Sequence, residues 1–138
     1  MNPDYQLAYW GLYLILMTLV VQQVVASASK ASQPGSVPGK IDSSLSHGSL
    51  VFRAHRTFMN SLENLPLLLG TVFLAVFVGA DPLWTAILVW VFALGRLMHM
   101  LLYYAIATER NPSPRSYFFA LAFIANVALL GVVGLALV

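Results

Sequence analysis

The sequence has no cysteine and very few charged residues. Because all 138 residues lack a thiol, neither a disulfide nor a protein thiolate can take part in the structure or its chemistry. Only 9% of the residues are charged, whereas 59% are apolar and the mean hydropathy is +0.80. This composition excludes an ordinary soluble domain. We therefore expect an integral membrane protein.

The sequence also lacks the alternation of apolar and polar residues that is typical of strands in a membrane barrel. Its apolar residues instead form four long runs, each longer than the roughly 20 residues that a spanning helix needs. We predict an all-α fold, in which residues 1–138 form a single domain built as a transmembrane four-helix bundle. The predicted helices cover residues 5–29, 50–79, 82–108 and 114–137.

Acidic residues are scarcer than basic ones, with five Asp and Glu against seven Lys and Arg. All the basic residues except Arg96 lie in or beside the loops that follow the first and third predicted helices. Because Lys and Arg accumulate on the cytoplasmic side of membrane proteins, we predict that both loops are cytoplasmic and both termini are not. The membrane would be the inner membrane if the protein is bacterial. This distribution gives no indication of a nucleic-acid partner.

The connections between the predicted helices differ in character. Residues 30–49 are rich in Ser, Gly and Pro, and they form a predicted cytoplasmic loop. Its length leaves a lid and a disordered linker as equal alternatives. Asp81-Pro82 and Ser113-Pro114 each combine an N-cap residue with a first-turn proline, so they are predicted to begin the third and fourth helices.

Four polar residues interrupt the second apolar run. Their spacing places them within a stripe of roughly 80 degrees on one helix face. They are Arg53, Arg56, Asn60 and Glu63. A charged side chain near the middle of a bilayer costs roughly 2.5 to 3.5 kcal/mol, and such residues usually face a bundle interior or a wet cavity. The stripe therefore predicts a polar binding site.

A second polar stripe lies along one face of the third predicted helix and is formed by Arg96, His99 and Tyr103. Glu63 and Arg96 lie at similar depths, roughly 24 and 21 Å from the outer helix ends at 1.5 Å per residue. Because an unpaired charge in a membrane costs more than a pair, we predict that these two are linked directly or through a neighbour. Cationic donors together with a carboxylate and an amide suit a small zwitterionic ligand with more than one carboxylate.

Arg115 lies in the first turn of the fourth predicted helix, where the macrodipole disfavours a cation. A bound anion would resolve this conflict, since free backbone amides and a guanidinium together form an anion receptor. The alternative is that Arg115 only reaches a lipid phosphate.

The run from Arg53 to Pro66 resembles the signature of the MAPEG family, the membrane-associated proteins in eicosanoid and glutathione metabolism. Gly95, Arg96 and the residues up to Tyr103 are similar to the branch that contains prostaglandin E synthases, and the chain resembles a bacterial-type member. The resemblance covers the second to fourth helices. It implies a homotrimer of four-helix subunits that binds glutathione between neighbouring subunits, near the cytoplasmic ends of the helices.

The resemblance also implies a set of glutathione-binding residues. They are Arg53, Arg56, Asn60, Glu63, His99 and Tyr103, with Arg110 as a further candidate. The first two arginines match groups near the glutathione carboxylates. The amide and the carboxylate match groups that hold its peptide and amino ends, and the aromatic pair matches the wall formed by the third helix.

Arg115 and Ser116 resemble the Arg-Ser pair whose members stabilise or contact the glutathione thiolate, so they are the expected catalytic residues. The loop before this pair is longer than in the family pattern, which makes Arg110 a competitor for the thiol role. The chain departs from the prostaglandin branch at Phe119, where that branch has a tyrosine, and at Met59, where it has an arginine. We expect no metal site.

The leading hypothesis is a glutathione S-transferase-like enzyme, with a peroxidase or isomerase side activity, that acts on hydrophobic electrophiles or lipids from the bilayer. A guanidinium and a helix amino terminus together lower the pKa of a nearby thiol, which explains Arg115 in an otherwise unfavourable place. The alternatives are a non-catalytic lipid-binding or scaffold protein of the same fold, and a small transporter.

Overall fold

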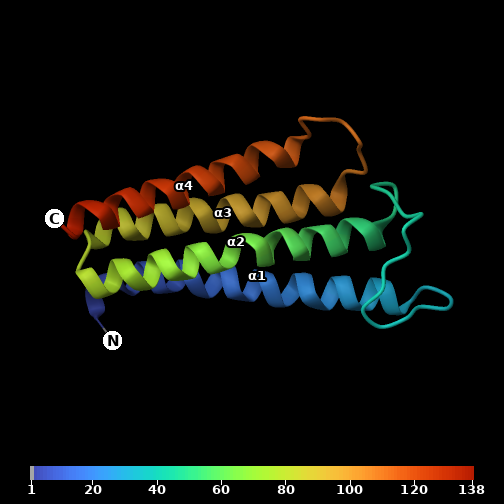
Figure 1. The fold of residues 1–138 in the computed structure, drawn as a ribbon, viewed down its shortest axis with the longest axis horizontal. Helices are drawn as coiled ribbons and strands as arrows, with labels where there is room; N and C mark the ends of the chain where they lie inside the picture. The colour runs from blue at the N-terminus through green and yellow to red at the C-terminus, as the bar shows by residue number, and fades with distance from the viewer. Residues whose placement is uncertain (1) are drawn as a thin grey trace.

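The computed structural model describes residues 2–138 as four long α-helices that lie side by side (Figure 1). The helices are α1 (Gln6–Ala31), α2 (Leu50–Val78), α3 (Pro82–Ala105) and α4 (Pro114–Ala136), with a short 3-10 helix, η1 (Pro3–Tyr5), before α1. No strand occurs in this part of the chain. The expected all-α fold is confirmed, and all four helices are long and apolar enough to cross a membrane. The protein is a multi-pass integral membrane protein.

The two ends of the bundle differ in their connections. Both chain termini and the short α2–α3 turn lie at one end, whereas the α1–α2 and α3–α4 loops lie at the other (Figure 1). The two basic loops therefore share one side of the membrane, as the charge distribution requires. That this side is the cytoplasm stays a prediction.

Helix α3 ends three residues before the predicted boundary at residue 108. The backbone of Ile106 turns to an extended conformation, with φ −113° and ψ 110°, while its N–H still closes the last helical bond to the Leu102 carbonyl at 2.9 Å. Ile106 and Thr108 are both β-branched, which lowers their helix propensity. The loop before α4 therefore spans residues 106–113.

The helix starts follow the local signals in the sequence. The Asp81 carboxylate accepts a hydrogen bond from the Trp84 backbone N–H at 2.9 Å, and Pro82 begins α3. Helix α2 ends at Val78, and the following Gly79, with a φ of 69°, forms a left-handed cap that allows the immediate turn into α3. Helix α4 begins at Pro114, as the Ser-Pro pair predicts.

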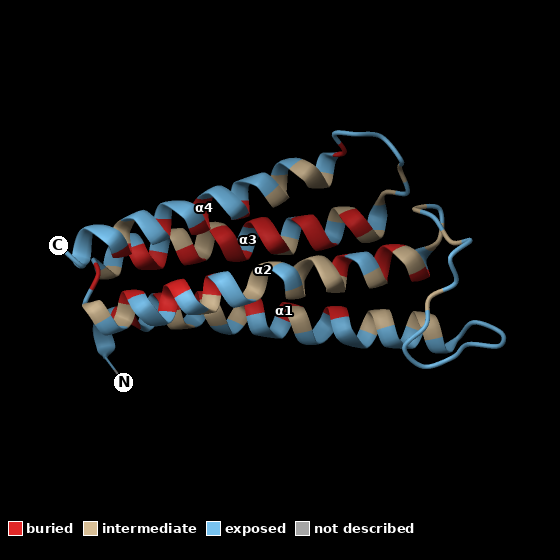
Figure 2. Cartoon of the chain, viewed as in Figure 1, coloured by how far each residue is buried: buried red, intermediate tan, exposed pale blue. Residues whose placement is uncertain are grey.

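Helix α3 is the most enclosed of the four helices (Figure 2). Half of its most apolar stretch is buried, against 22–28% for the other three helices, which leave large apolar side chains exposed to lipid. Helices α3 and α4 approach closely at Gly95. A Cβ atom there would lie 3.2 Å from both the Ala122 Cβ and the Phe118 carbonyl oxygen. A small residue is therefore needed at this crossing.

We expect Gly95→Leu to destabilise the protein by about 1–3 kcal/mol, because the added side chain would have to separate α3 from α4. Gly131→Leu is the matched control, since a Cβ at Gly131 meets nothing within 4 Å. Thermal unfolding of the detergent-solubilised variants measures the difference. Equal stability of the two variants would mean that the helices do not pack closely at Gly95.

Candidate functional site

An open cavity of about 180 Å³ lies at the loop end of the bundle, between α2, α3 and α4. Seven residues line it: Arg56, Asn60, His99, Tyr103, Arg115, Ser116 and Phe119. The first six are among the nine site residues predicted from the sequence. The fold thus brings together polar groups that lie up to 60 residues apart along the chain. Among residues 2–138, no group of His, Asp and Glu is arranged to hold a metal ion.

Arg115 lines this cavity and contacts both α3 and the loop that precedes α4. Its guanidinium carbon lies 4.1 Å from the centre of the Tyr103 ring, which forms a cation–π contact. One terminal nitrogen, Nη2, lies 3.4 Å from the Thr108 carbonyl oxygen and donates a long hydrogen bond to it. The other, Nη1, is buried and has no hydrogen-bond partner within residues 2–138. The site therefore keeps an uncommitted donor beside the amino terminus of α4.

Ser116 is held by the start of its own helix. Its Oγ accepts a hydrogen bond from the Ser113 backbone N–H at 3.3 Å and lies 3.1 Å from the Ser113 Oγ. This reciprocal arrangement is a capping box, which satisfies amide groups at the first turn of a helix. Ser116 therefore fixes the beginning of α4, on which the position of Arg115 depends.

His99 contributes a second uncommitted polar group. Its side chain is almost fully buried between Tyr103 and Phe119, with ring centroids 5.5 and 6.3 Å away. The Nδ1 atom has no hydrogen-bond partner in the part of the chain that the structure describes. Because a buried polar atom without a partner is costly, it indicates a place where a ligand or water binds.

Arg96 does not bind the residue that the sequence analysis predicted. Its Nη1 donates to the Asn60 Oδ1 at 2.8 Å and its Nη2 donates to the Ser61 Oγ at 2.9 Å. Glu63 is exposed, and among residues 2–138 it forms no ion pair. Among these residues no hydrogen bond or ion pair joins Glu63 directly to Arg96, so the direct form of the predicted pair is absent, and a link through a neighbour stays a prediction.

Two predicted binding arginines lie outside the cavity. Arg53 is buried, and its guanidinium donates to the carbonyl oxygens of His47 at 2.7 Å, Gly48 at 3.0 Å and Tyr104 at 3.3 Å. It therefore ties the α1–α2 loop to the end of α3. Arg110 is exposed in the α3–α4 loop and does not line the cavity.

Sequence reasoning missed His47 of the α1–α2 loop, which contacts Tyr103 in the cavity wall. Its Nδ1 lies 2.6 Å from the Glu109 Oε2, and its backbone N–H donates to the Glu109 Oε1 at 3.0 Å. Its Nε2 lies 3.1 Å from the Tyr103 hydroxyl, and the two rings stack. His47 and Glu109 lie 62 positions apart in the sequence, so no local signal indicated this contact. The last part of the long loop is thus anchored to Tyr103 and to the α3–α4 loop.

We expect this anchor to weaken in acid. The hydrogen bonds from His47 hold the pKa of the Glu109 carboxyl below its ordinary value. A carboxyl with a lowered pKa stabilises the folded contact above its ordinary pKa, and that contribution is lost as the pH falls through the lowered value. The protection of the amides of residues 43–49, measured as the observed exchange rate relative to the intrinsic rate at the same pH, should therefore fall at that pH.

Glu109→Gln should give the same fast exchange at neutral pH, because it removes the charge that His47 contacts. Arg110→Gln is the neighbouring control and should leave the exchange slow. Similar protection in both variants at neutral pH would show that the His47–Glu109 contact does not hold the loop.

Comparison with known proteins identifies the family. The chain matches the MAPEG family over residues 7–135, which covers all of α2 and α3 and nearly all of α1 and α4. The chain therefore belongs to the MAPEG family, and the resemblance seen in the polar stripes is confirmed. Membership makes it a glutathione-related membrane protein. Neither the curated proteins nor the solved structures that were compared match the chain.

Proposed function

We propose that the protein is a glutathione transferase of the membrane, which forms the glutathione thiolate and joins it to hydrophobic electrophiles. One observation carries the proposal. The Arg115 guanidinium lies in the first turn of α4, over Tyr103 and beside a polar cavity, with Nη1 uncommitted. A cation in that position opposes the helix macrodipole unless an anion binds next to it.

The residues around the cavity suit glutathione, which combines two carboxylates, two amide groups and a thiol. Arg56 supplies a full positive charge at the cavity wall, and Asn60 supplies an amide. Arg115 and His99 add buried polar atoms that have no partner among residues 2–138. Charge-assisted hydrogen bonds from such groups are about twice as strong as neutral ones, so an anionic ligand would be favoured.

Bound glutathione supplies the thiol, whose proton passes to solvent. The thiolate sulfur then forms the new bond to carbon of the electrophile while the bond to the leaving group breaks, so that a chloronitrobenzene releases chloride with the bonding pair. A thiol with a pKa near 8.5 is mostly protonated at pH 7. Arg115 and the first amides of α4 favour the anion, and each unit by which they lower the thiol pKa corresponds to about 1.4 kcal/mol. Tyr103 holds the guanidinium in place through its ring face.

Arg115 suits this role better than Arg110. The Arg115 side chain is partly buried, whereas Arg110 is exposed in the loop. Water and salt screen the field of an exposed charge, while a partly buried charge acts more strongly on its neighbours. Arg110 also lacks a place in the cavity wall.

The cavity in one chain supports a site shared between subunits of a homotrimer. Its volume of about 180 Å³ lies below the roughly 300 to 1,000 Å³ that is typical of ligand pockets. Glu63 lies outside the cavity and is exposed, so its carboxylate would reach a ligand that is bound against a neighbouring subunit. We therefore assign Arg115 and Glu63 of one site to different subunits.

The second substrate would enter from the bilayer. Phe119, one turn beyond Arg115 on α4, is the apolar residue of the cavity wall. A hydrophobic electrophile or lipid would therefore meet the thiolate beside this ring.

Arg115→Ala should reduce thiolate absorbance on addition of glutathione, and it should lower kcat/KM for a chloronitrobenzene by about tenfold or more, which corresponds to at least one pKa unit. Arg110→Ala should change both by less than about twofold, because an exposed charge contributes little. A larger loss of thiolate absorbance and activity in Arg110→Ala than in Arg115→Ala would mean that Arg110 stabilises the thiolate. Glutathione binding without conjugation in the unmodified protein would favour a non-catalytic lipid-binding protein.

Mixed oligomers test the shared site. Glu63→Gln and Arg115→Ala should each have low activity alone. Co-expressed, they should form intact sites at about a quarter of the positions, because that fraction of a random mixture pairs an intact Arg115 with an intact Glu63 of a neighbouring subunit. Arg56→Ala mixed with Arg115→Ala is the control, since both residues line the cavity of one chain and no intact site can form. Equal activity of the two mixtures would contradict the assignment of Glu63 and Arg115 to different subunits.

A further inference from the structure

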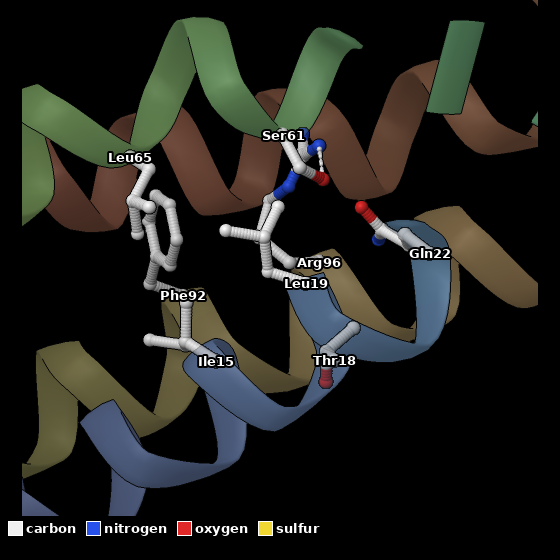
Figure 3. Close-up of a pocket in the computed structure, with 8 residues that line it drawn as sticks. All are labelled: Ile15, Thr18, Leu19, Gln22, Ser61, Leu65, Phe92 and Arg96. Atoms are coloured by element: carbon white, nitrogen blue, oxygen red, sulfur yellow. Dashed lines mark hydrogen bonds between the residues drawn. The ribbon is translucent and has the colours of Figure 1, made fainter. Parts of the chain in front are cut away.

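A second and much smaller cavity lies inside the bundle, where α1, α2 and α3 meet (Figure 3). Its volume is about 10 Å³, and most of its wall is apolar. Three polar residues, Gln22, Ser61 and Arg96, line it as well. Thr18 also borders the cavity, but its hydroxyl donates to the Leu14 carbonyl of its own helix at 2.8 Å.

Gln22 is the unexplained group in this cavity. Its side chain is completely buried, yet neither its Oε1 nor its Nε2 has a hydrogen-bond partner among residues 2–138. Figure 3 shows the amide extending from α1 toward Ser61 and Arg96. A buried amide without partners is strongly disfavoured, and in a membrane no bulk water is at hand to satisfy it. A subunit packed outside this chain could not reach Gln22, because the chain itself covers it.

The size and chemistry of the cavity select its occupant. A volume of roughly 10 to 15 Å³ is what one water molecule needs, and a buried water requires two to four polar partners. The Gln22 amide offers donors and an acceptor. The Ser61 Oγ already accepts from Arg96 at 2.9 Å, so its hydroxyl hydrogen is free to donate to a water. Any larger ligand is excluded by the volume.

We propose that this cavity is a binding site for one water molecule, which joins Gln22 of α1 to Ser61 and Arg96. This water would also affect the candidate functional site. Arg96 donates from Nη2 to Ser61 and from Nη1 to Asn60, and Asn60 lines the larger cavity. Gln22 is therefore a positioning residue, which acts through the water and Arg96 on the side chain of Asn60. This last step rests on the proposed glutathione site.

Gln22→Leu tests the water site, with Gln23→Leu as the matched control on the exposed face of α1. If water joins Gln22 to Ser61, leucine removes a satisfied network, so the Tm of the solubilised protein should fall by several degrees relative to the control. If the cavity is dry, leucine removes an unsatisfied amide, so the Tm should rise. A Tm that is unchanged or higher overturns the proposal.

Glutathione affinity, measured by calorimetry, tests the positioning role. Gln22→Leu should weaken binding by about fivefold, the size of one lost hydrogen bond, whereas Gln23→Leu should not. Gln22→Glu should restore the affinity, because its carboxylate keeps acceptors facing Arg96. A lower Tm with unchanged affinity would overturn the link to Asn60. Absence of binding in the unmodified protein would refute the glutathione site, while the Tm comparison would still decide the water site.

A density map of the unmodified protein at a resolution that shows ordered water avoids any effect of a substitution on folding. We expect a peak within hydrogen-bond distance of the Gln22 amide and the Ser61 Oγ. An empty cavity with the amide turned toward a protein group would overturn the proposal.

Discussion

A guanidinium inside a hydrocarbon layer must find its hydrogen-bond partners within the protein, and Arg96 meets this requirement in the middle of the bundle. It is 4% exposed and donates to two oxygens of α2. These bonds fix α2 against α3 at one rotation and one height. Because Asn60 is one of the acceptors, the same bonds orient a residue of the candidate site. The hydrogen bonds that offset the cost of burying the Arg96 charge therefore also fix the position of Asn60 in the candidate site.

The loop end of the bundle depends on a second set of polar contacts. Arg53 satisfies three backbone carbonyls that would otherwise lack partners where the α1–α2 loop meets α3. His47 then connects this loop to Glu109 and Tyr103. The family resemblance places Arg53 beside the glutathione carboxylates. In this chain, however, its guanidinium binds backbone carbonyl oxygens. The positive charge at the cavity wall comes from Arg56 and Arg115.

The cavity itself combines what a thiolate site needs with signs that it is incomplete. Arg115 brings a guanidinium to the amino terminus of α4, where the macrodipole adds to its positive field. Ser116 secures that terminus through the capping box. The small volume and the exposed position of Glu63 are the observations behind the proposal that neighbouring subunits complete the site. Membership in the MAPEG family makes glutathione the ligand to test first.

The sequence by itself determined the four helices, their membrane character and the start of α3 and α4, because these follow from apolar run length and from local cap residues. It also placed Arg56, Asn60, His99 and Tyr103 as site candidates, since helical spacing puts each stripe on one face. Arg115 became a candidate because a cation in the first turn opposes the helix macrodipole. Only the tertiary structure decided the partners: Arg96 with Asn60 instead of Glu63, Arg53 with carbonyls, and His47 with Glu109. Periodicity gives the height and face of a residue within one helix, whereas its partner depends on how the helices rotate and approach each other.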